Sequence, residues 1–127
     1  MKEIGSWRAD KAGFKIELGA TELLGLGKCI YAFTDTNDNF LRIGSSKNKL
    51  HDRMKAWERD VTKAILGQRS PTPVHEAKKW MEYQAGTVWA RQGTVVETSV
   101  GKFECYLDEE SVLIGRHLPP LNHSKHR

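Results

Sequence analysis

One acidic side chain lies in a row of apolar residues near the end of the chain. Glu110 falls at helical spacing among four apolar residues that predict the buried face of a helix beginning near Lys102: Phe103, Leu107, Ile114 and Leu118. Burying a carboxylate costs free energy unless a cation or hydrogen bonds compensate. Glu110 is therefore either half of a structural ion pair or a ligand for a metal ion, and its position alone leaves both readings open.

A second set of side chains that could do chemistry lies on an expected β-hairpin. Residues 28–33 and 41–44 predict two strands, and the polar run 35–39 between them favours a turn. Because side chains alternate along a strand, Tyr31 lies on one face of the first strand. Arg42 should project from the second strand on that same face. We expect the reactive site at this hairpin.

A helix should follow the hairpin, from an N-cap at Asn48 to about Leu66. Five apolar residues at spacings of three and four form its buried stripe: Leu50, Met54, Trp57, Val61 and Ile65. Arg53 lies at the edge of this stripe. That position suits a guanidinium that reaches a site, and it suits an arginine that extends into solvent just as well.

Basic residues gather at two places. The first group surrounds the start of this helix and consists of Lys47, Lys49, Arg53 and Lys55. A second group lies near the end of the chain: Arg116, His117, His123, Lys125, His126 and Arg127. Each group is either a solvated basic surface or, if the two lie together in the fold, one part of a phosphate-binding surface.

The other segments predict further strands and a second helix. Phe14–Leu18 alternates as an edge strand would. The second helix should begin at Pro73, end at Gly86 and bury four residues: Val74, Ala77, Trp80 and Met81. A third strand is expected at Thr87–Arg91, and 95–100 is either a strand or an extended connection.

The order and spacing of these residues resemble those of the GIY-YIG nucleases. Cys29-Ile30-Tyr31 and Arg42-Ile43-Gly44 match the paired motifs of that family, except that Cys29 replaces its first glycine and Arg42 its second tyrosine. Arg53 falls at the family's helix arginine, nine residues beyond Gly44. The closing motif of the family is matched by five residues: Glu110, Leu113, Ile114, Pro119 and Asn122.

The resemblance covers residues 28–122 and implies an α+β fold. Its expected architecture is a small three-stranded antiparallel sheet flanked by helices. Residues 1–27 would then be an N-terminal extension, and residues 123–127 a basic tail.

The resemblance also implies a role for each motif residue in cutting phosphodiester bonds. Glu110 would bind Mg²⁺, with Mn²⁺ as an alternative, and Arg53 would donate to the phosphate as a planar fork. Tyr31 would help to deprotonate the attacking water, aided by Arg42, because a nearby cation lowers the pKa of a phenol. Asn122 would orient Glu110 or pin the last turn of the chain.

Several basic residues are candidates for further contacts. His51 is an alternative general base, since an imidazole titrates near neutral pH. Four side chains are candidates for binding DNA: Lys47, Lys49, Lys55 and Arg116. Lys47 and His51 are also candidates for contacts with the phosphate or the water.

Composition predicts a single cytoplasmic domain. The chain has 127 residues, a formal net charge of +4 and a pI near 9.1, which is mild for a nucleic-acid-binding protein. We find neither an apolar run that could span a bilayer nor a signal-peptide core, so no membrane partner is expected. Cys29 and Cys105 suit neither a zinc cluster nor a disulfide framework.

Three functions remain open at this stage. The first is a metal-dependent DNA endonuclease of restriction, phage or repair type, which should act as a homodimer when it cuts both strands of a duplex. The second is a non-catalytic nucleic-acid-binding domain of the same fold. The third is a small interaction protein in which Arg53 and Glu110 form a structural ion pair.

Overall fold

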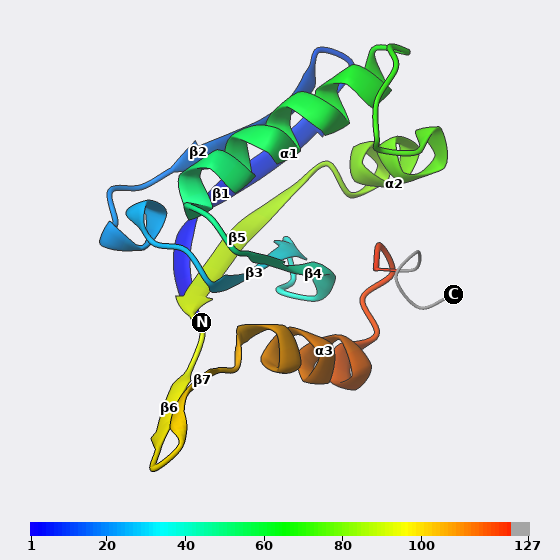
Figure 1. Cartoon of the computed structure of the whole chain (residues 1–127). Coiled ribbons are helices and arrows are strands. Elements are labelled where there is room, and N and C mark those ends of the chain that lie inside the picture. The colour runs from blue at the N-terminus through cyan, green and yellow to red at the C-terminus, as the bar shows by residue number, and fades with distance from the viewer. Residues whose placement is uncertain (123–127) are drawn as a thin grey trace.

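A computed structural model of the chain defines the fold of residues 1–122 (Figure 1). Within these residues the fold is α+β, with a five-stranded antiparallel sheet, a two-stranded hairpin and three α-helices. The large sheet has the order β2-β1-β5-β3-β4 and contains these strands: β1 (Lys2–Asp10), β2 (Gly13–Leu18), β3 (Cys29–Asp35), β4 (Phe40–Ser46) and β5 (Ala85–Gln92). The other elements are the short 3-10 helix η1 (Glu22–Gly25), α1 (Leu50–Ile65), α2 (Val74–Tyr83), β6 (Val95–Thr98), β7 (Gly101–Glu104) and α3 (Tyr106–His117).

The expectation of a three-stranded sheet was wrong, because β1 and β2 extend it to five strands. The prediction that Phe14–Leu18 forms an edge strand is confirmed by β2. The inner strand β1 was missed because a bulge between Glu3 and Gly5 breaks its alternation, leaving Ile4 and Trp7 three residues apart. Trp7 is buried, and its indole N–H donates to the carbonyl of Thr34 on β3 at 2.8 Å.

Helices cover both faces of the sheet (Figure 1). On one face, α1 and α2 enclose a large core rich in stacked and edge-on aromatic rings: Trp7, Phe14, Tyr31, Phe33 and Trp80. On the other face, α3 covers only the β3–β4 end of the sheet. Its small core consists of five buried residues: Ile30, Ala32, Ile43, Tyr106 and Ile114.

Two helix boundaries on the first face differ from the prediction. The residue before α1 is Lys49 instead of Asn48, and no side chain caps that end. The second helix ends at Tyr83, where Gln84 adopts a positive φ of 74°, so the helix stops before Gly86. Gly86 lies within β5, where a Cβ would collide with the backbone of the neighbouring β3. Val74 was expected in the core but is exposed.

The final helix starts later than predicted, at Tyr106, since the segment from Lys102 belongs to the β6–β7 hairpin. Of the predicted apolar row, Ile114 is buried, but three members are exposed: Phe103, Leu107 and Leu118. The buried face of α3 is formed by Tyr106, Glu110 and Ile114. Residues 95–98 form a strand, which resolves the alternative left open by the sequence.

The expected basic tail, residues 123–127, lies outside the described residues. No helix within residues 1–122 is both long and apolar enough to cross a membrane.

Candidate active site

The site forms around the edge strand β4 and its neighbour β3. Tyr31 on β3 lies directly opposite Gly44 on β4, and the phenol ring packs over that glycine. A Cβ at position 44 would overlap the ring and hydroxyl of Tyr31. Gly44 is therefore required by close packing, and Tyr31 is held with only 1% of its surface exposed.

The hydroxyl of Tyr31 receives two hydrogen bonds from α1. The indole N–H of Trp57 donates to it at 2.7 Å, and Nε of Arg53 donates at 3.3 Å. The pKa of Arg53 is raised above its ordinary value by interaction with Tyr31, against the effect of burial, with smaller contributions from Glu110 and Asp60. Arg53 remains charged and partly open to solvent while Tyr31 fixes one edge of its guanidinium.

Glu110 approaches the same edge from the opposite face of the sheet. It lies on the buried face of α3 with 7% of its surface exposed, as the sequence predicted. The hydroxyl of Ser45 on β4 donates to its Oε1 at 3.1 Å. The negative charge of Glu110 also contributes to the raised pKa of Arg53. Arg53 from α1 and Glu110 from α3 thus reach this edge of the sheet from opposite faces.

Two pockets adjoin Arg53. The first has a volume of about 410 Å³ and is lined by residues of β4, α1 and α3 and the loop after β4, among them Ser45, Lys47, Lys49, Asp52 and Arg53. Three of those side chains are cationic and one is a carboxylate, which makes the pocket favourable for anions. The second pocket, of about 330 Å³, is lined by Arg42, Arg53 and Trp57, with the carboxylates of Asp60 and Glu76.

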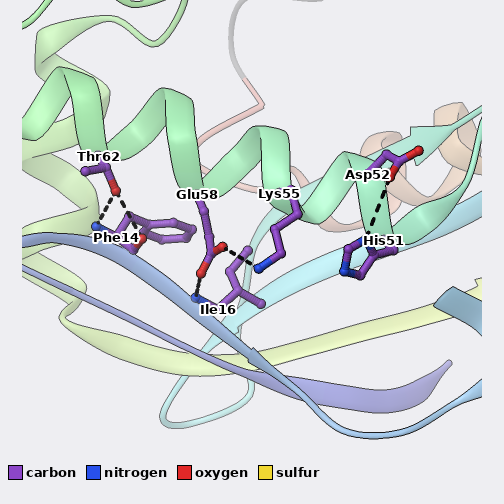
Figure 2. Close-up of polar contacts among 7 residues, drawn as sticks. All are labelled: Phe14, Ile16, His51, Asp52, Lys55, Glu58 and Thr62. Carbon is purple, nitrogen blue, oxygen red and sulfur yellow. Dashed lines mark hydrogen bonds and ion pairs between the residues drawn. The ribbon is translucent and has the colours of Figure 1, made fainter.

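Three of the predicted contact residues lie away from these pockets. Lys55 pairs with Glu58 at 3.4 Å on the side of α1 that faces β2 (Figure 2). His51 lies beside Asp52 at 3.7 Å in the first turn of α1, and lines neither of the two (Figure 2). Arg116 is exposed near the end of α3.

Figure 2 also shows how α1 is anchored to β2. The Glu58 carboxylate accepts from the amide of Ile16 at 2.8 Å. The hydroxyl of Thr62 accepts from the amide of Phe14 at 2.9 Å and donates to the carbonyl of that residue at 3.1 Å. These bonds fix the position of the helix that carries Arg53.

The segment after α3 closes one part of the β4 edge. The side-chain amide of Asn122 accepts from the amide of Ile43 and donates to its carbonyl, both at 2.7 Å. The amide of Leu121 donates to the carbonyl of Leu41 at 2.9 Å. Of the two roles predicted for Asn122, these contacts match the pinning of the last turn.

Arg42 lies on the same sheet face as Tyr31, as the alternation predicted, because it pairs with Phe33 across the strands. Its Nη1 donates to the carbonyl of Leu121 at 2.6 Å, and its guanidinium lies 5.3 Å from the centre of the Trp57 ring. The guanidinium that reaches the Tyr31 oxygen is that of Arg53. The aid that Arg42 would give to deprotonation stays a prediction.

Ser45 and Trp57 were not among the predicted site residues. Trp57 follows Arg53 by four positions, so the two share one face of α1, and this spacing was a usable signal. Ser45 faces α3 because it is two residues from the buried Ile43. Its partner Glu110 is 65 residues away, and nothing in the sequence joins them.

Comparison with known proteins shows likeness at the level of structure. The sequence matches no protein-family description and no curated protein. The fold is similar to that of a mutant of bacteriophage T4 EndoII, with a TM-score of 0.62 and 19% identity over 95% of this chain and 90% of that one. It is also similar to the restriction endonuclease Hpy188I in complex with product DNA, with a TM-score of 0.54 and 13% identity over 97% of this chain and 79% of that one.

Proposed function

We propose that this protein is a divalent-metal-dependent DNA endonuclease that hydrolyses phosphodiester bonds. The observation that carries the proposal is a basic pocket at the β4 edge that is lined by Arg53 and by Ser45, whose hydroxyl donates to the buried Glu110 on the other face of the sheet. The likeness in fold to Hpy188I, a restriction endonuclease with bound product DNA, supports the choice of substrate. The motif resemblance to GIY-YIG nucleases agrees with both.

The donor groups fit Mg²⁺, with Mn²⁺ as the alternative. No group of three or more His, Cys, Asp or Glu side chains that could hold a metal ion occurs within residues 1–122. A single buried carboxylate is enough for Mg²⁺, which keeps several waters and takes other oxygens from substrate phosphates. Glu110 would hold the ion, and the bound ion would supply a more acidic water and neutralise charge on the phosphate.

The side chains around Glu110 would divide the remaining tasks. Lys47 and Lys49 attract the DNA backbone into the pocket. Arg53 donates to the non-bridging oxygens of the phosphate, where negative charge builds as water attacks the phosphorus and the leaving oxygen departs. Tyr31 orients Arg53 through its hydroxyl. As the general base, Tyr31 would act in its phenolate form, which would take the proton of the water and become a neutral phenol.

Cleavage of supercoiled plasmid with Mg²⁺, Mn²⁺ or EDTA tests the proposal. The wild type should cut with either metal ion and be inactive with EDTA. Glu110→Ala should lose cleavage by about a thousandfold or more while keeping its circular dichroism spectrum and its affinity for DNA. Asp108→Ala removes an exposed carboxylate from the same helix and should cut as the wild type does.

The two alternative functions predict other outcomes. A wild type that binds DNA in a salt-sensitive way but never cuts it would be a nucleic-acid-binding domain. An unfolded Glu110→Ala variant would favour a structural ion pair with Arg53. Metal-dependent cleavage by Glu110→Ala at the wild-type rate would contradict the assignment of Glu110 to the metal ion.

A further inference from the structure

The β6–β7 hairpin projects from the body of the molecule as a separate ribbon (Figure 1). All residues of both strands are exposed, including Val96 and Phe103, which pair across the hairpin. Phe103 has 51% of its surface exposed. A two-stranded ribbon with apolar side chains in water is marginally stable on its own, and its outer edges offer unpaired backbone groups.

The hydrogen-bond pattern identifies which backbone groups of β7 face outward. The amide of Cys105 donates to the carbonyl of Thr94 at 2.9 Å, so these two residues form a hydrogen-bonded pair. Bonded and non-bonded pairs alternate along an antiparallel ladder. Phe103 is therefore bonded inward to Val96, whereas the N–H and C=O groups of Lys102 and Glu104 point to the free edge of β7.

We propose that β7 is a dimerisation edge that pairs antiparallel with β7 of a second copy of this chain, centred on Phe103. In this register Lys102 lies opposite Glu104 of the second copy, and Glu104 lies opposite its Lys102. These two residues are the ones whose backbone groups point outward, so the pairing forms four backbone hydrogen bonds together with two opposite-charge pairs.

The side-chain faces of the combined sheet agree with this register. Val96 and Phe103 share one face of the hairpin because they lie opposite one another. Two-fold symmetry places the two Phe103 rings side by side, between the two Val96 side chains, in one apolar row. On the other face, Glu97 lies 3.4 Å from Lys102 within the chain, and Glu104 of the second copy continues the alternation of charge.

The charge of the ribbon favours a second copy over nucleic acid as the partner. Its strands carry two carboxylates, Glu97 and Glu104, and one ammonium group, Lys102. Both carboxylates are paired with a lysine, Glu97 with Lys102 and Glu104 with Lys28, so the ribbon has no excess of positive charge that would attract a phosphate backbone. The same charges are self-complementary under two-fold symmetry. The proposal does not depend on nuclease function, because association is measured without DNA or metal ions.

Two charge variants and their mixture test the register. Lys102→Glu and Glu104→Lys each set like charges opposite one another at both ends of the interface, so each should self-associate at least about tenfold more weakly than the wild type. An equimolar mixture of the two variants should dimerise again, because both intermolecular pairs become opposite in charge. Sedimentation velocity over a range of protein concentrations measures all three.

The mixture separates intermolecular pairing from effects within one chain. Lys102→Glu loses the pair with Glu97, and Glu104→Lys loses the pair with Lys28, and mixing restores neither. Lys15→Glu makes the same charge change on β2, the edge strand at the far side of the large sheet, and should leave association unchanged. A monomeric mixture, or a dimer that is indifferent to both variants, would overturn the proposal.

A disulfide provides a second test that does not depend on affinity. Residues opposite one another in a non-bonded antiparallel pair have Cα atoms about 4.5 Å apart, which lies within the range that a disulfide spans. With Cys105 changed to Ser, Phe103→Cys should form a covalent dimer on mild oxidation. Val96→Cys in the same background lies on the same face but one strand further from the two-fold axis, and it should remain monomeric. Equal crosslinking of both variants, or none in Phe103→Cys, would contradict the register.

Discussion

The two sides of the candidate site are built in different ways. The arginine side, Tyr31, Arg53 and Trp57, rests on the large core, where Trp57 packs edge-on against Phe33 with ring centres 5.2 Å apart. The carboxylate side, Ser45 and Glu110, rests on α3 and the small core. The helix that carries Arg53 is hydrogen-bonded to β2. In contrast, α3 is followed by Asn122, whose side chain is bonded to the backbone of Ile43 on β4; we call these two hydrogen bonds the Asn122 clamp.

This difference indicates how each charged group keeps its position. Arg53 is placed by a core that the protein needs for folding in any case. Glu110 is placed by a helix with few buried residues, so its position depends on a small number of polar contacts. Variants on the two sides should therefore separate loss of chemistry from loss of position.

After Glu110→Ala, the largest effect should come from Arg53→Lys on the arginine side. Lysine keeps the positive charge but lacks the planar guanidinium group with its several N–H donors. It therefore cannot hydrogen-bond to Tyr31 and to the phosphate at the same time in the same geometry. We expect turnover to fall by about a hundredfold or more, with little change in melting temperature or in DNA affinity. Single-turnover cleavage measures this rate. A rate within a few-fold of the wild type would mean that only the positive charge of Arg53 contributes, and not the geometry of its guanidinium.

Asn122→Ala tests the carboxylate side through its clamp. Removal of the amide leaves the N–H and C=O groups of Ile43 without these bonds, which should lower the free energy of unfolding by about 2 kcal/mol. Hydrogen exchange should increase in α3 and stay nearly constant in α1. Urea unfolding and exchange mass spectrometry check this, with the exposed Asn48→Ala as control. Equal loosening of both helices would show that the two sides are not independent.

Ser45→Ala is a finer test of the same side. Loss of the hydroxyl leaves Glu110 in place but less well oriented, so affinity for the metal ion should fall by about tenfold. Binding of Mn²⁺ followed by electron paramagnetic resonance measures this without turnover. Ser45→Thr keeps the hydroxyl and should bind like the wild type, whereas an equal loss in both variants would point to packing instead.

The smallest effect belongs to the turn between β3 and β4, which lies outside both sides. The amide of Asn39 lowers the pKa of Asp35 below its usual 3.8, with help from the amide of Asn37 and the Asn39 side chain and against desolvation. A lowered pKa means that the folded state favours the carboxylate. This stabilisation is present above about pH 3.8 and is lost as the pH falls through the folded pKa.

Asp35→Asn isolates that effect. Its melting temperature should be slightly below that of the wild type at neutral pH, and the two should converge below about pH 3.8. A constant difference across this range would mean that the charge of Asp35 does not stabilise the turn.

The sequence was sufficient where local patterns and burial agree. The β3–β4 hairpin has a polar turn between two strands, α1 has a long apolar stripe, and a lone carboxylate in an apolar row identified Glu110. Tyr31 and Arg42 also lie on the same face of the sheet, as the alternation along the strands predicted. These features depend on neighbours within a few turns or one hairpin.

The sequence was insufficient where pairing over long distances decides the structure. A bulge interrupts the alternation of apolar and polar residues in β1. Phe103 falls at helical spacing from the buried residues of α3, although it belongs to β7. The contact of Ser45 with Glu110 depends on how α3 docks. His51 is a residue type that suits a general base. In the structure it lies beside Asp52 in the first turn of α1, away from both pockets.

The Asn122 clamp also has a consequence for the order in which the protein folds. It joins residues 79 positions apart, so its formation closes a long loop and costs chain entropy. The arginine side is formed by residues up to the end of β5, whereas the carboxylate side also needs α3 and Asn122. On refolding from the denatured state, the arginine side should therefore form before the carboxylate side, and the proposed metal site should be completed last.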